Sequence, residues 1–186
     1  GQLLDGGQIY DVNRFTLGAI VEAHGGAARW HKAAQDTLES LTRALDECLE
    51  SDLIVSSGGS SVGARDLVVD LVAARGEMIF HGIAVKPGKP TAFALVGMSG
   101  KSGKSGQPGK SGQTPFFGMP GNPTSCLSNA YILLIPFLRA IARLPPHTPR
   151  TARVPLGRPI ASTAGRHQFY SVRLKNGTAF PAFKGS

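Results

Sequence analysis

The sequence predicts an α/β fold with a three-layer arrangement, in which helices cover both faces of a mainly parallel sheet. Apolar strand-like runs alternate with segments of helical periodicity along residues 1–145. Polar loops rich in Gly or Pro follow three of the strand-like runs, at the strand ends where ligands bind in such folds. With 186 residues and 41% apolar side chains, the chain is long enough to bury one complete core.

Two helices are predicted in the N-terminal part of the chain. The first has an apolar stripe that begins near Asp11 and ends at Gly25-Gly26. The second is expected to have Asp36 as its N-cap, with Glu39 three residues later as the capping-box partner. One face of this second helix carries Leu38, Leu41, Leu45 and Leu49.

Two further helices are predicted. Asp66 can cap the third, which ends at Gly76. A long fourth helix is expected over 125–144, where Pro136 should kink it and Pro145-Pro146 should end it.

Short apolar runs bounded by Gly, Pro or polar residues predict the strands. These runs are 53–55, 78–85, 91–96 and 114–118, with a weaker candidate at 27–31. Because the strands should be mainly parallel, the polar loops at their ends are expected to share one crevice.

The junction at 119–125 (MPGNPTS) has the features of an anion site. Gly121 lets the backbone approach a ligand closely, and Pro123 suits the first turn of the helix that follows. The unpaired N–H groups at such a helix start favour negative charge.

Two segments depart from the alternating pattern. Residues 99–113 contain Gly, Ser, Lys, Gln and Pro but no large apolar side chain, which predicts a mobile loop that is either a natural insertion or an engineered linker. Residues 146–186 are expected to form part of a small C-terminal β domain, with a hairpin turn at Asn176-Gly177. We therefore expect the chain to be a fragment with one α/β domain at 1–145.

Charge is distributed unevenly along the chain. All twelve Asp and Glu lie within residues 1–77 together with six Lys and Arg, whereas residues 78–186 carry fourteen Lys and Arg and no acid. This division suits a site that holds an anionic ligand on one side and a divalent cation on the other, or simply a basic surface. The basic residues lack an aromatic-basic stacking motif, so nucleic-acid binding is not expected.

The two cysteines and the hydropathy of the chain indicate its cellular location. Cys48 and Cys126 lie in apolar helical patterns, so we expect buried reduced thiols and a cytoplasmic location. The longest apolar run, 131–138, is much shorter than the roughly 20 residues that cross a bilayer, so no membrane role is expected.

Four motifs in order carry a family resemblance: residues 7–13 (GQIYDVN), 57–66 (SGGSSVGARD), 86–90 (KPGKP) and 120–125 (PGNPTS). Together they resemble the MoeA/gephyrin E-domain family, the molybdopterin molybdenumtransferases. Residues 7–144 look like that family's molybdopterin-binding domain, whose fold is like that of MogA, and 150–186 look like the start of its C-terminal β domain.

The resemblance implies an activity and a set of site residues. Such enzymes use Mg²⁺ to insert molybdate into adenylylated molybdopterin with release of AMP, and the full-length proteins are homodimers. By resemblance, Lys86 and Lys89 bind molybdate, and Asp66 and Asp36 hold Mg²⁺ and assist cleavage of the adenylate. The expected pterin-binding and phosphate-binding residues are Gly58, Gly59, Ser61, Gly63, Gly121, Asn122, Pro123 and Ser125.

The chain also departs from the family pattern. Ser171 stands where the family has an Arg that contributes to molybdate capture, so Arg166 or Arg173 must substitute or the site is altered. Ala64 replaces a frequent acid. Two alternatives therefore stay open: a non-catalytic molybdopterin-binding or scaffold module, and a molybdopterin adenylyltransferase, which the Lys-Pro-Gly-Lys-Pro turn disfavours.

Overall fold

The computed structural model describes residues 6, 10–58, 66–97, 112–162 and 164–182. Helices are α1 (Val12–Ala23), α2 (Leu38–Cys48), α3 (Leu67–Arg75), α4 (Pro123–Asn129), the π-helical η1 (Ala130–Leu134) and α5 (Ile135–Ile141). Strands are β1 (Ile54–Ser57), β2 (Gly76–His81), β3 (Val85–Lys86), β4 (Ala92–Gly97), β5 (Gln113–Met119), β6 (His167–Gln168), β7 (Val172–Lys175) and β8 (Thr178–Pro181). The α/β class is as the sequence predicts.

The central sheet is mixed, so the expectation of a mainly parallel sheet is wrong. Its strand order is β1-β5-β4-β2, and only the β1–β5 pair is parallel among these described strands. The reason lies in the connections: after α3 the chain forms β2, β3, β4 and β5 with no described helix between them. Strands joined without a crossover helix can pair as antiparallel neighbours.

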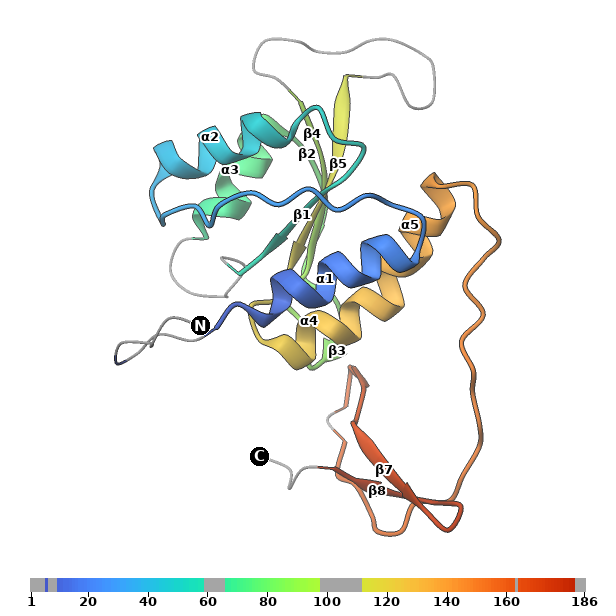
Figure 1. The fold of residues 1–186 in the computed structure, drawn as a ribbon. Coiled ribbons are helices and arrows are strands. Elements are labelled where there is room, and N and C mark those ends of the chain that lie inside the picture. Colours follow the sequence, from blue (N-terminus) through green and yellow to red (C-terminus); the bar gives the residue numbers. More distant parts are fainter. Residues whose placement is uncertain (1–5, 7–9, 59–65, 98–111, 163, 183–186) are drawn as a thin grey trace.

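Helices pack on both faces of this sheet (Figure 1). On β5, Phe117 packs with α1, α4 and α5, whereas the preceding Phe116 packs with α2 and α3. Alternate side chains of a strand point to opposite faces, so the two apolar clusters are separated by the sheet. Met119 and Leu134 are fully buried in the first cluster, and Val72 and Val96 in the second.

The helix caps are partly as predicted. Asp11 and Asp66 cap α1 and α3, since the carboxylate of each accepts hydrogen bonds from backbone N–H groups of the first turn. The N-cap of α2 is Thr37 rather than Asp36, because Thr37 has the extended backbone that a cap needs and its hydroxyl accepts from the Ser40 N–H at 3.3 Å. The capping box of Asp36 and Glu39 is therefore wrong, and Glu39 instead pairs with Arg43 at 2.8 Å.

The predicted strand at 27–31 is also absent: this described segment has no regular secondary structure. Trp30 explains why, because its indole ring packs against Gly18 of α1 and lies 5.1 Å from the Arg14 guanidinium. The segment covers a helix instead of extending the sheet.

Pro136 changes the long helix without ending it. The chain passes from α4 through the π-helical η1 into α5, and Pro136 lies in the first turn of α5. Proline cannot donate to the preceding turn, and the wider π segment just before it accommodates that loss. By length and composition, Pro123–Ile141 could also cross a membrane, but its buried side chains belong to the core.

The C-terminal residues form short β elements below the α/β body (Figure 1). β7 and β8 make the predicted hairpin, in which Asn176 and Gly177 both have positive φ, at 49° and 73°. β6 pairs in parallel with β3, which joins this region to the α/β body. The predicted mobile loop at 99–113 lies outside the described residues except for its end, where Gln113 begins β5.

Candidate functional site

The loops that follow β1 and β5 touch each other at one edge of the sheet. In the parallel β1–β5 register, Ser57 is opposite Met119, and the Gly58 N–H donates to the Met119 carbonyl at 3.2 Å. A Cβ on Gly121 would lie 3.4 Å from the Cα of Gly58, so the two backbones are in van der Waals contact. Gly58 has φ +87°, a conformation that strongly favours glycine.

Asn13 of α1 ties these two loops together. Its Nδ2 donates to the Ser57 hydroxyl at 2.7 Å and to the Gly121 carbonyl at 2.8 Å, and its side chain is buried. Asn13 ends the 7–13 motif, but the motif alone assigns it no role. A polar residue on the buried face of α1 was the available signal.

α4 begins at Pro123, two residues before the predicted start, and its N-cap is Asn122. Asn122 Oδ1 accepts from the Ser125 N–H at 3.1 Å and from the Ser125 hydroxyl at 3.3 Å, while Pro123 occupies the first helical turn. The Ser125 side chain is buried, so its hydroxyl shapes the cap, whereas Asn122 and Pro123 are exposed at the edge of the site.

The Lys-Pro-Gly-Lys-Pro segment, residues 86–90, is called the lysine turn below. Lys86 and Lys89 are exposed and flank Gly88, which is buried. The Gly88 carbonyl accepts from Asn129 Nδ2 at 2.7 Å and from the Thr91 hydroxyl at 3.0 Å. The lysine turn is thus fixed at its centre, and its two cationic side chains face solvent.

The C-terminal segment runs beside the lysine turn. The Phe169 N–H donates to the Lys86 carbonyl at 2.8 Å, and the His167 N–H donates to the Ala84 carbonyl at 2.8 Å. Arg166 directly precedes β6 on this segment, whereas Arg173 lies on β7, which pairs with β8. Of the two Arg residues that could replace the missing one at Ser171, Arg166 is next to the strand that pairs with β3.

Comparisons with known proteins agree with this geometry. A family profile described as "Probable molybdopterin binding domain" matches residues 1–140, which is most of the chain. The chain belongs to this molybdopterin-binding family. The match contains all four motifs and confirms the MoeA/gephyrin resemblance, together with the relatives named below.

The relatives of this molybdopterin-binding domain are longer proteins. A molybdopterin molybdenumtransferase of Haemophilus influenzae is 30% identical over 178 residues, covering 92% of this chain and 40% of the relative. Gephyrin of Dictyostelium discoideum is 45% identical over 108 residues, covering 57% of this chain and 15% of the relative. The MoeA protein of Pyrococcus horikoshii has a similar structure, with a TM-score of 0.74 and 32% identity over 99% of this chain and 41% of that one. The chain thus spans about two fifths of the molybdenumtransferase and MoeA relatives.

Asp66 fits a role as a cation ligand in this molybdopterin-binding domain. Its Oδ1 caps α3 by accepting from the N–H groups of Val68 and Val69, both at 3.2 Å. Its Oδ2 is buried and has no hydrogen-bond partner among the described residues. A buried carboxylate oxygen without a donor is unfavourable unless a cation or ligand compensates it.

Asp36 is exposed at the start of α2, and its carboxylate accepts no hydrogen bond from the described part of the chain. Within the described ranges, no three His, Cys, Asp or Glu side chains gather to hold a metal. Any Mg²⁺ here would therefore take most of its ligands from substrate oxygens and water, which is usual for this ion. The remaining predicted site residues, Gly59, Ser61 and Gly63, lie outside the described residues.

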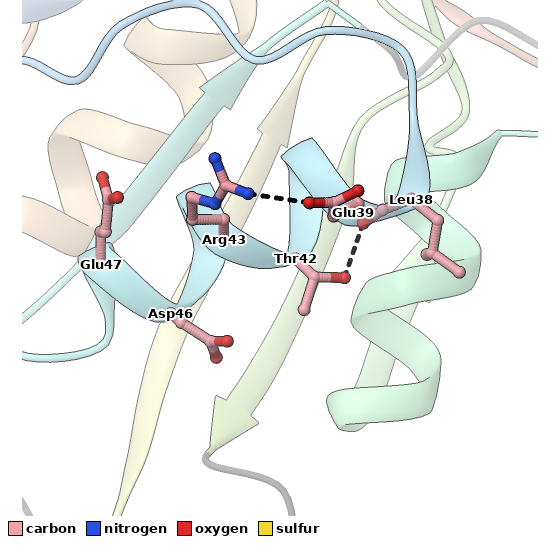
Figure 2. A pocket seen from close by; sticks show the side chains of 6 residues that line it. All are labelled: Leu38, Glu39, Thr42, Arg43, Asp46 and Glu47. Carbon is pink, nitrogen blue, oxygen red and sulfur yellow. Dashed lines mark hydrogen bonds and ion pairs between the residues drawn. The ribbon is translucent and has the colours of Figure 1, made fainter.

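Two other features supply no reactive group to this site. Burial raises the pKa of the Cys126 thiol to about 11, which keeps it protonated in the core beneath the loops. A shallow depression lies on α2, where Figure 2 shows six lining side chains from this one helix and the Glu39–Arg43 ion pair. A hollow lined by one exposed helix brings no loops together and has no part in the candidate site.

Proposed function

We propose that this chain is the molybdopterin-binding catalytic part of a molybdopterin molybdenumtransferase and acts in molybdenum cofactor biosynthesis. Its substrates are adenylylated molybdopterin and molybdate, and its products are the metal-loaded pterin and AMP. The observation that carries the proposal is the contact between the loops after β1 and β5, which Asn13 holds beside the start of α4. The similarity to the molybdopterin molybdenumtransferase of Haemophilus influenzae supports the same chemistry.

The lysine turn is proposed to bind molybdate. Lys86 and Lys89 are exposed on either side of a fixed Gly88, which leaves both ammonium groups accessible to an oxyanion. Lysine donates to tetrahedral oxyanions through three N–H groups.

The loops after β1 and β5 are proposed to bind the pterin phosphate and the nucleotide. Backbone N–H groups of a glycine-rich turn and of a helix start are suited to phosphate oxygens. The residues assigned to this role are Gly58, Gly59, Ser61, Gly63, Gly121, Asn122, Pro123 and Ser125.

Asp66 and Asp36 are proposed as the ligands of Mg²⁺. The partnerless Oδ2 of Asp66 supports this assignment more directly than the exposed carboxylate of Asp36 does. When bound, Mg²⁺ would neutralise charge that develops on the AMP leaving group.

The first prediction tests the lysine turn. In a Lys86→Ala, Lys89→Ala double variant, molybdate-triggered AMP release should fall at least about 100-fold, because the oxyanion loses two charge-assisted contacts. The measurements are calorimetric binding of adenylylated molybdopterin with Mg²⁺ and chromatographic assay of AMP after molybdate is added.

A Lys32→Ala, Lys175→Ala variant is the control, because it removes the same charge from two exposed positions outside the three loops. It should retain AMP release. Equal activity of both double variants would refute the role of the lysine turn.

A second function is favoured by one observation. Ser171 stands in place of the family's Arg and is exposed near the β3–β6 pair. Without that cation the domain could hold the pterin nucleotide as a binding or scaffold module and not turn it over. Tight binding of the pterin nucleotide without AMP release in the unmodified chain would favour this function.

The larger context of the domain is also proposed. The helices on both faces of the sheet would make the three-layer domain of the family, and 146–186 would begin a C-terminal β domain completed elsewhere in a longer homodimeric protein. A cytoplasmic location accords with the two free cysteines.

A further inference from the structure

A closed network of buried hydrogen bonds joins α4 to the lysine turn. Asn129 Nδ2 donates to the Gly88 carbonyl at 2.7 Å and to the Thr91 hydroxyl at 2.5 Å, and that hydroxyl donates to the same carbonyl at 3.0 Å. The side chains of Asn129 and Thr91 are fully buried. The centre of the lysine turn is therefore held by two side chains that never reach solvent.

Gly88 and Asn129 occupy one shared space. Gly88 has φ +110°, and a Cβ there would lie 2.4 Å from Asn129 Nδ2 and 2.5 Å from Oδ1. Any other residue at position 88 would displace the Asn129 amide. The lysine turn can pass this close to α4 only because glycine faces the asparagine.

The Oδ1 atom of Asn129 adds a second observation. It is buried and has no hydrogen-bond partner in the described part of the chain. A buried carbonyl oxygen without a donor lowers stability, and the two hydrogen bonds that Nδ2 donates offset this cost. These two hydrogen bonds go to Gly88, at the centre of the lysine turn, and to Thr91, the residue that follows the turn.

Asn129 lies at the end of α4, so the hydrogen-bond network connects the lysine turn to the helix that begins at the loop after β5. Asn122, whose side chain caps α4, precedes Asn129 by seven residues, which is two turns and about 10 Å along one helix face. One rigid helix thus begins at the loop after β5 and supports the lysine turn two turns later. The two parts of the candidate site are spaced by α4.

We propose that Asn129 is a positioning residue that sets the lysine turn at a fixed distance from the start of α4. The inference rests on the proposed function in one respect, since it takes the lysine turn as the molybdate-binding part. Asn129 touches neither substrate. It acts through the Gly88 carbonyl and so determines the backbone positions from which the Lys86 and Lys89 side chains extend.

Three variants test the proposal. Asn129→Asp keeps the shape and removes the amide donor, and Thr91→Val keeps the volume and removes the hydroxyl. Thr114→Val is the matched control, because Thr114 is also buried and its hydroxyl donates to the Leu49 carbonyl at 2.9 Å, outside the three loops. Each variant loses buried hydrogen bonding, but only the first two disturb the lysine turn.

The first readout needs no ligand. The N–H groups of Ile83 and Thr91 both donate to the Lys89 carbonyl, at 2.9 Å and 2.8 Å, so their hydrogen exchange reports on the lysine turn. In Asn129→Asp and Thr91→Val these two amides should exchange at least about tenfold faster, while the Gly58 amide, bonded to Met119, keeps its rate. Unchanged exchange at Ile83 and Thr91 would overturn the proposal whatever the function of the domain.

The second readout compares the affinities for two ligands, molybdate and adenylylated molybdopterin. In Asn129→Asp and Thr91→Val, molybdate should bind about tenfold more weakly while affinity for adenylylated molybdopterin changes less than about twofold. Thr114→Val should change neither affinity even where its Tm falls as much. Equal loss of both affinities, or a loss of molybdate affinity in Thr114→Val as well, would show a general structural effect and overturn the positioning role.

The lysine variant separates this inference from the proposed function. If Lys86→Ala, Lys89→Ala still binds molybdate, then the proposed function fails at the lysine turn, and faster exchange at Ile83 and Thr91 still supports the role of Asn129 in holding it. If that variant loses molybdate and Asn129→Asp binds it as the unmodified chain does, the proposed function stands and the positioning role is overturned.

Discussion

Two buried asparagines connect the loops of the candidate site. Asn13 joins the ends of β1 and β5, and Asn129 joins α4 to the lysine turn. Buried amides that bond backbone carbonyls fix loop positions more firmly than exposed charged side chains can, because their hydrogen bonds are shielded from water. At the scale of single residues, the charged groups supply the chemistry and these amides supply the geometry.

Asn13→Ala is predicted to weaken binding at the loops after β1 and β5. Loss of its hydrogen bonds to Ser57 and Gly121 should destabilise the chain by about 2 kcal/mol. Affinity for adenylylated molybdopterin should fall more than affinity for molybdate, the reverse of the Asn129→Asp pattern. Urea unfolding and calorimetric titration measure the two effects, and an Asn13→Ala variant with lower stability but unaltered pterin affinity would contradict the prediction.

At the scale of secondary-structure elements, the candidate site lies where two helices, α3 and α4, begin. The Asp66 carboxylate begins α3 and the Asn122 amide begins α4, and both helices start at loops that follow strands. Asp66 therefore has two separable roles, because one oxygen caps the helix and the other has no hydrogen-bond partner among the described residues.

Asp66→Asn and Asp66→Ala should separate those roles. Asparagine caps a helix about as well as aspartate, so Asp66→Asn should leave stability nearly unchanged, while Asp66→Ala should cost about 1 kcal/mol. If Oδ2 serves the cation, both variants lose Mg²⁺-dependent AMP release. Thermal unfolding and an Mg²⁺ titration of activity are the measurements, and full activity of Asp66→Asn would confine Asp66 to capping.

At the scale of the whole molecule, a cluster of Arg139 and two histidines joins α1, α5 and the connection to the C-terminal β elements. His24 Nδ1 lies 3.4 Å from the Arg139 guanidinium, and the rings of His24 and His147 are 5.6 Å apart. Burial, Arg139 and His147 lower the pKa of His24 below its ordinary value of 6.5. Protonation of His24 is therefore unfavourable in the folded chain.

This lowered pKa predicts a pH dependence of stability. The unfolded chain takes up the His24 proton first, so the full stability holds above about pH 6.5 and decreases as the pH falls from there toward the folded-state pKa. Below that value the loss is constant. The His24→Gln variant should show a smaller fall in Tm between pH 7.5 and 5.5 than the unmodified chain, whereas His81→Gln should not; equal falls in all three would contradict the prediction.

Local signals predicted much of the fold and part of the site. The Asp66 cap, the start of the first helix near Asp11 and the Asn176-Gly177 hairpin depend on neighbouring residues, so they could be predicted directly. The cap of α2 was misplaced by one residue because Asp36 and Thr37 both favour that position. The strand at 27–31 was wrong because the distant α1 provides the surface that Trp30 covers.

By itself the sequence determined the α/β class, the family and the residues that could bind an anion, because periodicity, turn chemistry and motifs are all local. Only the tertiary structure decided the mixed direction of the sheet and the joining of the loops by Asn13 and Asn129. Those contacts join positions 41 and 108 residues apart. Which distant backbone carbonyl a buried amide meets depends on how the whole chain packs.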